Sequence, residues 1–300
     1  MITDRSFSNM FARTRAEFAT APRVHTERWQ GNDISKRPEM VSYELLNWHC
    51  NVGLDWVTQL AAPKTQDWSH PSTLSGIADV IQPNLPWADD HFLERVGGEP
   101  LNPGEQWANW PWADSAAKHH VEGGKFNHTY MERLWPKWAG MTTAGVIEKG
   151  SHIRHVPDLQ RPLLPQPGGH YGIRHGYGDL EDLVDLLANE PLTRQAWIPL
   201  FFPEDTGVGD GGRKPCTLGY QFIMRDNALS VYYPLRSCDF VRHFRDDIYL
   251  AIRLLLWVLD RCRERRPDNW ENVVPGYYAM HCTSLHIFAN DRIQMFGASK

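Results

Sequence analysis

The sequence predicts an α+β fold with a large mixed β-sheet and flanking helices. Residues 179–191 have the spacing of an amphipathic helix that ends at a proline, and a short strand is expected at 195–202. Residues 216–237 alternate around a turn, as a β-hairpin does. A helix with acidic residues at its start is expected over 246–262, and a further strand over 277–291. Helices and strands are thus mixed along the chain.

Length and composition favour a folded soluble protein. The 300 residues (34.6 kDa) suffice for one large domain or two small ones with a substantial core. Hydrophobic residues make up 42% of the chain, and the 13 tryptophans argue against wholesale disorder. A net charge of −5 gives no long-range attraction for nucleic acid or anionic lipid, so neither partner is expected. With no internal repeat and no linker, we expect one domain over residues 1–300.

Targeting and redox signals favour the cytoplasm. The N-terminal segment lacks the apolar core of a secretory signal. The most apolar run, residues 248–259, is too short and, with Arg253, too charged to span a bilayer, so we expect a buried helix there. The odd number of cysteines, none in a C-x-x-C pair, is typical of reduced thiols: Cys50, Cys216, Cys238, Cys262 and Cys282.

Four further segments carry weaker signals. Residues 38–60 have apolar residues at spacings of three and four, which predicts a helix with Glu44 near its start. Residues 63–125 and 150–178 are rich in proline and glycine, and we expect long irregular insertions there, the first of them carrying short elements. Loops of this length are often functional. The histidines of the second insertion have no recognised ligand spacing, so no metal site is expected. The glycines of residues 204–213 lack the G-K-[ST] of a phosphate loop.

A nucleophile and an anion-binding group are expected at the two ends of the predicted hairpin. Cys216 begins its first strand, and Arg236 and Ser237 end its second, so pairing of the strands brings them together. A guanidinium favours the thiolate form of a neighbouring cysteine and offers a bidentate fork to phosphate. The pattern predicts a nucleophile beside a phosphate site, with a buried structural cysteine and a surface arginine as the alternative.

The ordered motifs resemble the thymidylate synthase family. PCTLGYQF, LRSCDFVRHFRDD and SLHIF are similar in order and spacing to its Pro-Cys, Arg-Ser-x-Asp and His-x-Tyr elements. Upstream, YELLNW resembles its helix with a catalytic glutamate, FNHTYMERLW its tyrosine segment, and NEPLTRQAW its arginine turn. The resemblance is strong over residues 179–291 and patchy before them. It implies a three-layer fold whose sheet forms the dimer interface, and a homodimer with shared active sites.

The resemblance assigns roles to particular residues. It implies that Cys216 adds to C6 of a pyrimidine nucleotide, which lets C5 attack the one-carbon group of 5,10-methylenetetrahydrofolate. Glu44 would organise proton transfer at the base, and Tyr130 would help to remove the C5 proton. The remaining implied roles are phosphate binding by Arg236, Ser237 and, across the dimer, Arg194; a polar contact behind the nucleophile by Gln221; sugar binding by His286; pterin binding by Asp239; and folate stacking by Trp110 or Trp112. A backbone contact of Gln221 and ordinary core packing of the tryptophans are the alternatives.

Asp247 is the residue that indicates the base. It stands where family members that act on uracil carry asparagine, whose amide accepts from N3–H and donates to O4. A carboxylate can accept from the N4 amino group of cytosine, whereas it would face the O4 lone pairs of uracil. Asp247 therefore favours deoxycytidylate (dCMP), with capping of the following helix as the alternative. Thr217, after the cysteine, is similar to the deoxycytidylate hydroxymethylases of phages, whereas uracil-specific members usually carry histidine there.

The C-terminal segment favours a hydroxymethyl product. Only about a dozen residues follow SLHIF, so the family's C-terminal lid is expected to be absent or replaced, for instance by residues 150–178. A wetter site favours capture of the one-carbon group by water and release of tetrahydrofolate. Phe288, where the family has tyrosine, leaves deoxyribose or ribose open. Gln195 and Leu235 also depart from the family pattern, which predicts weaker phosphate binding.

Three functional hypotheses follow from the sequence. The first is a dCMP 5-hydroxymethyltransferase of phage origin that acts in the bacterial cytoplasm. The second is a C5 methyltransferase of the same family that acts on dUMP, dCMP or CMP. The third is a nonenzymatic relative that binds a nucleotide or RNA, against which the intact Cys216, Asp239 and Glu44 argue.

Overall fold

The computed structural model describes residues 6–29, 32–60, 67–114, 126, 128–138, 143–149, 152–157, 177–206 and 214–297. The chain divides into two compact units whose segments alternate along the sequence. The first unit comprises Met1–Pro83, Leu186–Trp197 and Cys216–Lys300, and the second comprises Asn84–Asp185 and Ile198–Pro215. That the whole chain serves as one catalytic domain stays a prediction.

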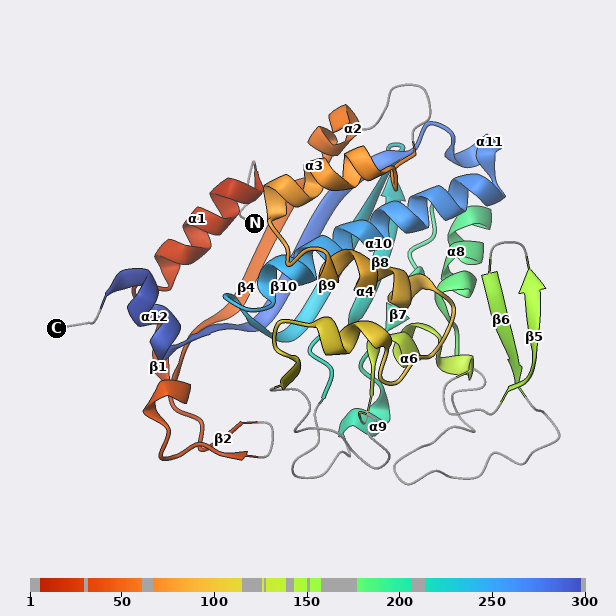
Figure 1. Cartoon of the computed structure of the whole chain (residues 1–300). Coiled ribbons are helices and arrows are strands. Elements are labelled where there is room, and N and C mark those ends of the chain that lie inside the picture. The colour runs from red at the N-terminus through yellow and green to blue at the C-terminus, as the bar shows by residue number, and fades with distance from the viewer. Residues whose placement is uncertain are drawn as a thin grey trace. The chain divides into compact units, whose positions relative to one another are not determined.

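A mixed six-stranded sheet flanked by helices dominates the fold, as expected (Figure 1). Its strands, in spatial order, are β1 (Arg23–Val24), β4 (Ser42–Gly53), β10 (Val274–Phe288), β9 (Ala228–Asp239), β8 (Gly219–Arg225) and β7 (Trp197–Pro199). Strands β9 and β10 are parallel, whereas β4 pairs with β10 and β8 pairs with β9 in antiparallel fashion. The β8–β9 hairpin confirms the predicted one, and Asp226 and Asn227 form its turn with φ of 51° and 56°. Two positive φ angles in a two-residue turn match the twist of the flanking strands.

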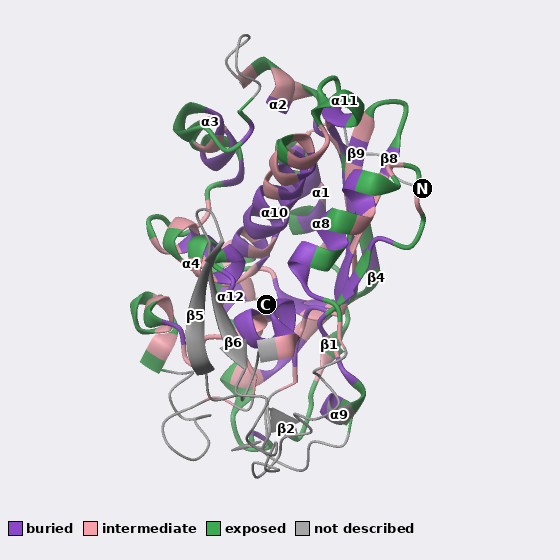
Figure 2. Ribbon diagram, turned by 90° about the vertical axis from the view of Figure 1, so that its right-hand side faces the viewer, coloured by how far each residue is buried: buried purple, intermediate pink, exposed green. Residues whose placement is uncertain are grey.

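Helix α10 (Phe244–Arg265) packs on one face of this sheet. Its ring contacts show which face: Phe244 lies 5.1 Å from Trp48 of β4 and 5.8 Å from Phe11, ring centroid to ring centroid. Residues 248–256 are all buried, so the expected buried helix is confirmed (Figure 2). The other helices of the first unit are α1 (Phe7–Glu17), α2 (Asp55–Leu60), α3 (Pro71–Ile81), α11 (Pro267–Trp270) and α12 (Ala289–Phe296). The unit also holds η1 (Pro38–Met40) and the small β2–β3 pair (Arg28–Trp29 and Asn32–Asp33).

The second unit is mainly helical. Its elements are α4 (Trp87–Val96), η2 (Glu105–Asn109), α6 (Tyr130–Leu134), η4 (Pro136–Trp138), the β5–β6 hairpin (Thr143–Lys149 and His152–Pro157) and α9 (Pro203–Thr206). The predicted amphipathic helix is α8 (Leu180–Asn189), which starts in this unit and ends in the first. A buried ion pair joins α6 to α9, with Arg133 Nη2 at 2.6 Å from Asp205 Oδ1. Among the described residues, no helix is both long and apolar enough to cross a membrane.

The helix predicted over residues 38–60 is wrong. Residues 42–53 form strand β4, and only the short α2 follows it. Trp48, Cys50 and Val52 are buried in alternation, the period of a strand, and β4 pairs along most of its length with β10. Because pairing in the centre of a sheet outweighs local helical spacing, tertiary structure decides this segment.

The prediction of long irregular insertions is also partly wrong. Within 63–125 the chain forms α3 and α4, and within 150–178 it forms β6. Pro71 at the first turn of α3, and Asp89 and Asp90 in the first turn of α4, are ordinary helix-start signals. Residues 115–125, 158–176 and the glycine-rich 207–213 lie outside the described residues.

Candidate active site

The hairpin brings the predicted nucleophile and anion-binding residues together. Arg236 N donates to Cys216 O at 2.9 Å, and Arg236 Nη2 lies 3.7 Å from Cys216 Sγ. Ser237 Oγ lies 3.8 Å from the same sulfur and accepts from Arg236 Nη1 at 3.2 Å. Cys216 is half-buried, whereas the other cysteines are buried: Cys50, Cys238, Cys262 and Cys282. The predicted juxtaposition is therefore present, and the roles of the three residues stay predictions.

An irregularity shared by three adjacent strands shapes this end of the sheet. Buried residues occur three positions apart instead of two at Leu235 and Cys238 on β9 and at Cys282 and Leu285 on β10, and Asn47 on β4 has a φ of 53°. The register of β10 with both neighbours continues unchanged across these positions, so the three strands change direction together and no extra residue is inserted. On β9 the irregularity falls at Arg236 and Ser237, which leaves the guanidinium exposed beside Cys216.

Glu44, His286 and Asp239 form a row across three strands. His286 of β10 is the register partner of Glu44 on β4 and of Asp239 on β9. Directly paired residues point to the same face of a sheet, so the three side chains share one face. Ser42 Oγ donates to Glu44 Oε1 at 3.0 Å. Glu44 thus lies on a strand and not on the helix that the resemblance implies, and its catalytic role stays a prediction.

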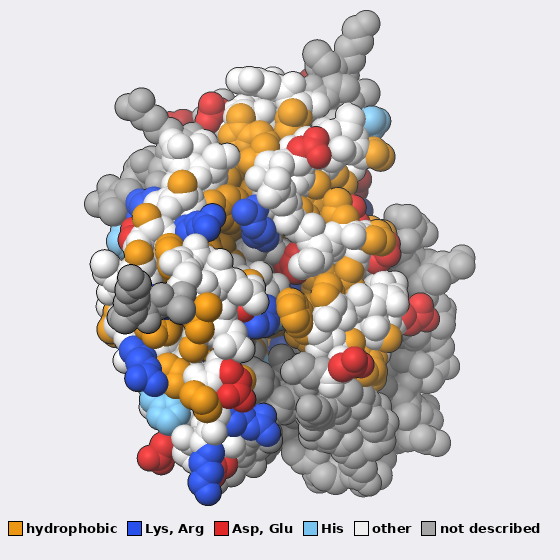
Figure 3. All heavy atoms as spheres, turned by 60° about the vertical axis from the view of Figure 1, so that its left-hand side comes forward, with side chains coloured by type: hydrophobic (Ala, Val, Ile, Leu, Met, Phe, Trp, Pro, Cys, Tyr) orange, Lys and Arg blue, Asp and Glu red, His pale blue; other side chains and the backbone are white. Residues whose placement is uncertain are grey.

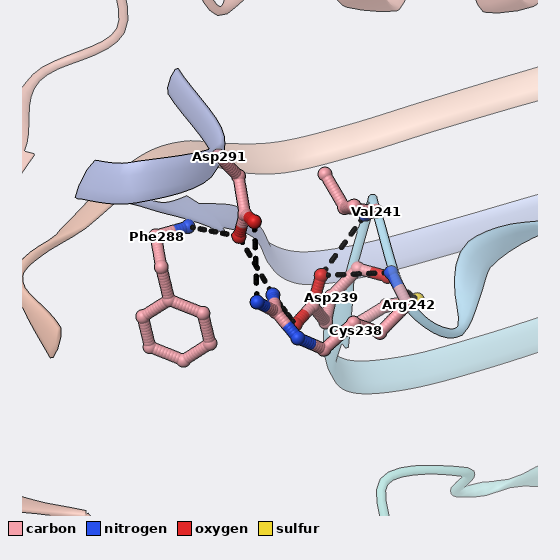
Figure 4. Close-up of polar contacts among 6 residues, drawn as sticks. All are labelled: Cys238, Asp239, Val241, Arg242, Phe288 and Asp291. Carbon is pink, nitrogen blue, oxygen red and sulfur yellow. Dashed lines mark hydrogen bonds and ion pairs between the residues drawn. The ribbon is translucent and has the colours of Figure 1, made fainter. Parts of the chain in front are cut away.

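Asp239 is engaged in an ion-pair cluster (Figure 4). Its Oδ1 accepts from the backbone amides of Val241 and Arg242 at 2.9 and 3.1 Å. Its Oδ2 accepts from Arg242 Nη1 at 2.9 Å, and the same guanidinium binds both oxygens of Asp291 in α12 at 2.6 and 3.1 Å. Despite desolvation by burial, hydrogen bonds and charge from Asp291 and Asp239 raise the pKa of Arg242. Both carboxylate oxygens of Asp239, the residue predicted to bind the pterin, therefore have protein partners in this structure.

The carboxylate of Asp247 faces the sheet. The N-cap residue of α10 is His243, and Asp247 lies beyond that position. Tyr233 OH donates to Asp247 Oδ1 at 3.3 Å, and Cys238 Sγ donates to Oδ2 at 3.4 Å. Burial, together with the Asp247 charge, raises the pKa of Cys238 well above its ordinary value, so Cys238 stays a thiol donor. Burial also raises the pKa of the Cys282 thiol, and the charges of Asp247 and Cys216 act in the same direction.

Arg194 and Gln221 lie near one another in the first unit. Gln221 Nε2 donates to Arg194 O at 3.1 Å, so the backbone contact given as the alternative for Gln221 is present. Arg194 itself is exposed in the turn after α8. Binding of Arg194 to a phosphate held by the other copy of a dimer stays a prediction.

Tyr130, Trp110 and Trp112 belong to the second unit. The rings of Trp110 and Trp87 are tilted, with centroids 6.2 Å apart, and Trp112 is 37% exposed. Tyr130 begins α6, where Thr129 and Glu132 form a capping box. Their predicted contacts with folate and base stay predictions.

The sequence reasoning missed a polar cluster around Tyr130. The Arg95 guanidinium lies 4.7 Å above the Tyr130 ring, and Arg95 Nε donates to His91 Nε2 at 3.0 Å. Glu94 Oε2 lies 3.3 Å from His91 Nδ1. Burial, and then the charge of Arg95, lower the pKa of His91 to about 4, so His91 is neutral near pH 7. The spacing of His91, Glu94 and Arg95 within one helical turn is a signal that could have identified the cluster.

We compared the chain with protein-family models and with curated protein sequences. Neither a protein-family model nor a curated protein sequence matches this chain. Within the part of the chain that the structure describes, no group of three or more His, Cys, Asp or Glu side chains could hold a metal ion. Figure 3, which brings the side of α1 and α12 forward, shows Lys and Arg side chains dispersed among hydrophobic ones on that face.

Proposed function

We propose that this chain is a dCMP 5-hydroxymethyltransferase with a thymidylate synthase-like three-layer fold. The single observation that carries the proposal is the half-buried Cys216 set against Arg236 and Ser237. A thiol beside an exposed guanidinium and a hydroxyl suits nucleophilic attack on a substrate whose phosphate is held by the same two side chains. Asp247, which hydrogen bonds connect through Tyr233 to Thr217 next to Cys216, supports a cytosine base.

The proposed reaction begins at the pyrimidine ring. The Cys216 thiolate adds to C6, and the electron pair of the C5–C6 double bond becomes available at C5. 5,10-Methylenetetrahydrofolate supplies a carbon at the oxidation level of formaldehyde. Joining that carbon to C5 would break its bond to one folate nitrogen, and loss of the C5 proton would break its bond to the other, so that tetrahydrofolate leaves and a methylene group stays on C5. Water would add its hydroxyl to this methylene group, and expulsion of the Cys216 thiolate would restore the C5–C6 double bond. The sum is dCMP plus methylenetetrahydrofolate plus water giving 5-hydroxymethyl-dCMP plus tetrahydrofolate, with no net oxidation or reduction.

Binding of folate through Asp239 would use a carboxylate that already has protein partners. Asp239 is only 5% exposed. Its carboxylate already accepts hydrogen bonds from the Arg242 guanidinium and from two backbone amides. A pterin can hydrogen-bond to it only beside these partners or after Arg242 turns away. Trp110 and Trp112 are the proposed stacking residues for the same ligand.

The proposal extends to the oligomeric state of the protein and to the cell in which it acts. We propose a homodimer with shared sites, in which Arg194 of one copy reaches the phosphate held by the other. A phage origin and a bacterial cytoplasm suit an enzyme that introduces modified cytosine into nucleotide pools. The exposed position of Arg194 supports its proposed contact with the phosphate in the other copy.

Tritium release from the base tests the proposal. The protein and methylenetetrahydrofolate are incubated with [5-³H]dCMP or, separately, with [5-³H]dUMP. Tritium released to water is counted, and the mass of the product is measured by mass spectrometry. We expect release from dCMP and a gain of about 30 Da, abolished in Cys216→Ser and retained in the matched thiol control Cys262→Ala. Release from neither nucleotide would reject the enzyme and favour the nucleotide-binding or RNA-binding relative.

The second candidate is a C5 methyltransferase that acts on dUMP, dCMP or CMP. It is distinguished by a gain of about 14 Da and by formation of dihydrofolate, since a hydride must then reduce the transferred carbon. Tyr233 and Cys238 both donate to Asp247, which favours an acidic side chain there and hence cytosine over uracil.

A further inference from the structure

A short chain of hydrogen bonds links the residue after Cys216 to Asp247. Thr217 Oγ1 lies 2.9 Å from Tyr233 OH, and Tyr233 OH donates to Asp247 Oδ1 at 3.3 Å. Thr217 is 1% exposed and Tyr233 is fully buried, so the bond between them is shielded from water, whereas the bond to the half-buried Asp247 is partly shielded. The Tyr220 ring stacks on the Tyr233 ring, with centroids 4.7 Å apart and planes 13° from parallel. The ring that carries the linking hydroxyl is therefore held in place.

With Asp247 ionised, the hydrogen bonds of this chain have one consistent direction. A phenol has one hydrogen, and an ionised carboxylate only accepts. Because Tyr233 gives its proton to Asp247, its oxygen accepts the proton of Thr217. On the other carboxylate oxygen, the Cys238 thiol is the donor. Residue 247 thus meets a donor on each oxygen, which suits a carboxylate and disfavours an amide.

We propose that Tyr233 is a positioning residue that sets the preference for cytosine over uracil by fixing the orientation of Asp247, with Thr217 fixing the orientation of Tyr233. The inference rests on the proposed function, because it concerns the base that Asp247 contacts. Asparagine at position 247 would turn its NH₂ either toward Tyr233, which would reverse the Thr217–Tyr233 bond, or toward the Cys238 thiol, which is itself a donor. Tyr233 therefore keeps the acceptor face of residue 247 available in one geometry.

Binding constants for dCMP and dUMP, measured by equilibrium dialysis without folate, test the inference. Tyr233→Phe removes the donor and keeps the ring, and we expect the ratio of dCMP to dUMP affinity to fall about tenfold or more, as for loss of a bond to a charged group. Tyr220→Phe removes a hydroxyl from the stacked ring without touching the Tyr233–Asp247 bond, and its ratio should equal that of the wild type. Thr217→Val should lower the ratio in the same direction by a smaller factor, and it replaces Tyr233→Phe should the latter fail to fold.

A double-mutant cycle separates positioning from general damage. If Tyr233 acts through Asp247, then Asp247→Asn changes the dCMP to dUMP ratio less in the Tyr233→Phe background than in the wild type, while it adds independently to Tyr220→Phe. A wild type that prefers dCMP, with Tyr233→Phe and Thr217→Val unchanged in preference, overturns the inference and leaves the proposed function standing. A wild type that binds both nucleotides equally, or neither, overturns the proposed function and this inference with it.

Discussion

At the scale of single residues, Arg236 is expected to bind the phosphate of the substrate. Its guanidinium is exposed beside Cys216 and donates to Ser237. Arg236→Gln should weaken binding of dCMP by about ten- to a hundredfold, the range for a charge-assisted bond, and leave binding of deoxycytidine unchanged. Calorimetric titration with the two ligands measures both. An equal loss for nucleotide and nucleoside would mean that Arg236 supports the structure around Cys216 and does not hold phosphate.

The guanidinium of Arg242 is expected to contribute to stability. It neutralises two carboxylates that are almost fully buried, those of Asp239 and Asp291, and so ties α12 to the end of β9. Arg242→Leu should lower the free energy of unfolding by about 3 kcal/mol, because an uncompensated buried charge is left behind. Denaturant titration measures this. Arg261→Gln, which breaks an ion pair with the exposed Glu264, is the control and should cost less than about 1 kcal/mol. Equal effects of the two changes would contradict the role given to the cluster.

At the scale of elements, Asp260 makes the attachment of the segment before α3 depend on pH. Its carboxylate, near the end of α10, accepts from the amides of Trp68 and Ser69 and from Ser69 Oγ. Burial raises the pKa of Asp260 from 3.8 to about 6. The folded state therefore binds the proton more tightly than the unfolded state. This contribution to stability is present below pH 4 and is lost as the pH rises through 6.

Asp260→Asn tests this pH dependence. The variant has no proton to lose, so its free energy of unfolding relative to the wild type should improve by up to about 3 kcal/mol between pH 4 and pH 7. Urea titrations at several pH values give the difference. A difference that stays constant over this range would show that Asp260 titrates alike in the folded and unfolded chain.

The elements also show which sequence signals were decisive. Helix α10 and the β8–β9 hairpin were predictable, because a long apolar run and a tight turn are specified by local residues. Strand β4 was mistaken for a helix because leucines and a tryptophan in YELLNW also occur at helical spacing. Its identity depends on β10, which lies more than 200 residues away in sequence, so only long-range pairing decides it.

Across the molecule, the sheet brings together candidate residues from segments that are far apart in the sequence. Strands β4 and β8 begin at the end of the sheet where β9 and β10 finish, since they are antiparallel to these neighbours. Cys216, Arg236, Asp239, His286 and Glu44 therefore lie at one end of four adjacent strands. The hairpin made the first two predictable as neighbours. The Arg242 cluster and the Tyr233 link were not predictable, because they depend on strand register and on the packing of α10 and α12 against the sheet.

The face of the sheet opposite α10 is where we expect a second copy of the chain. Trp48, Tyr233 and Cys238 point toward α10, since they contact Phe244 or Asp247. Three large apolar or aromatic side chains on the same strands have much exposed surface, and we place them on the opposite face: Leu46 at 67%, Tyr277 at 51% and Tyr232 at 39%. A stable homodimer buries roughly 800 Å² or more on each copy, with an apolar centre. A sheet face with these residues on three adjacent strands, β4, β10 and β9, suits such a centre.

A charge placed on this face should separate the copies. Leu46→Asp and Tyr277→Asp would each bury a carboxylate without a partner at the centre of the interface, so we expect monomers at concentrations where the wild type is dimeric. Leu93→Asp, at a side chain of the second unit that is 59% exposed, is the matched control and should leave the dimer intact. Sedimentation velocity measures the mass of each. Because Arg194 is proposed to act across the dimer, the two interface variants should also lose tritium release from dCMP, whereas a monomeric variant with full activity would show that each copy holds a complete site.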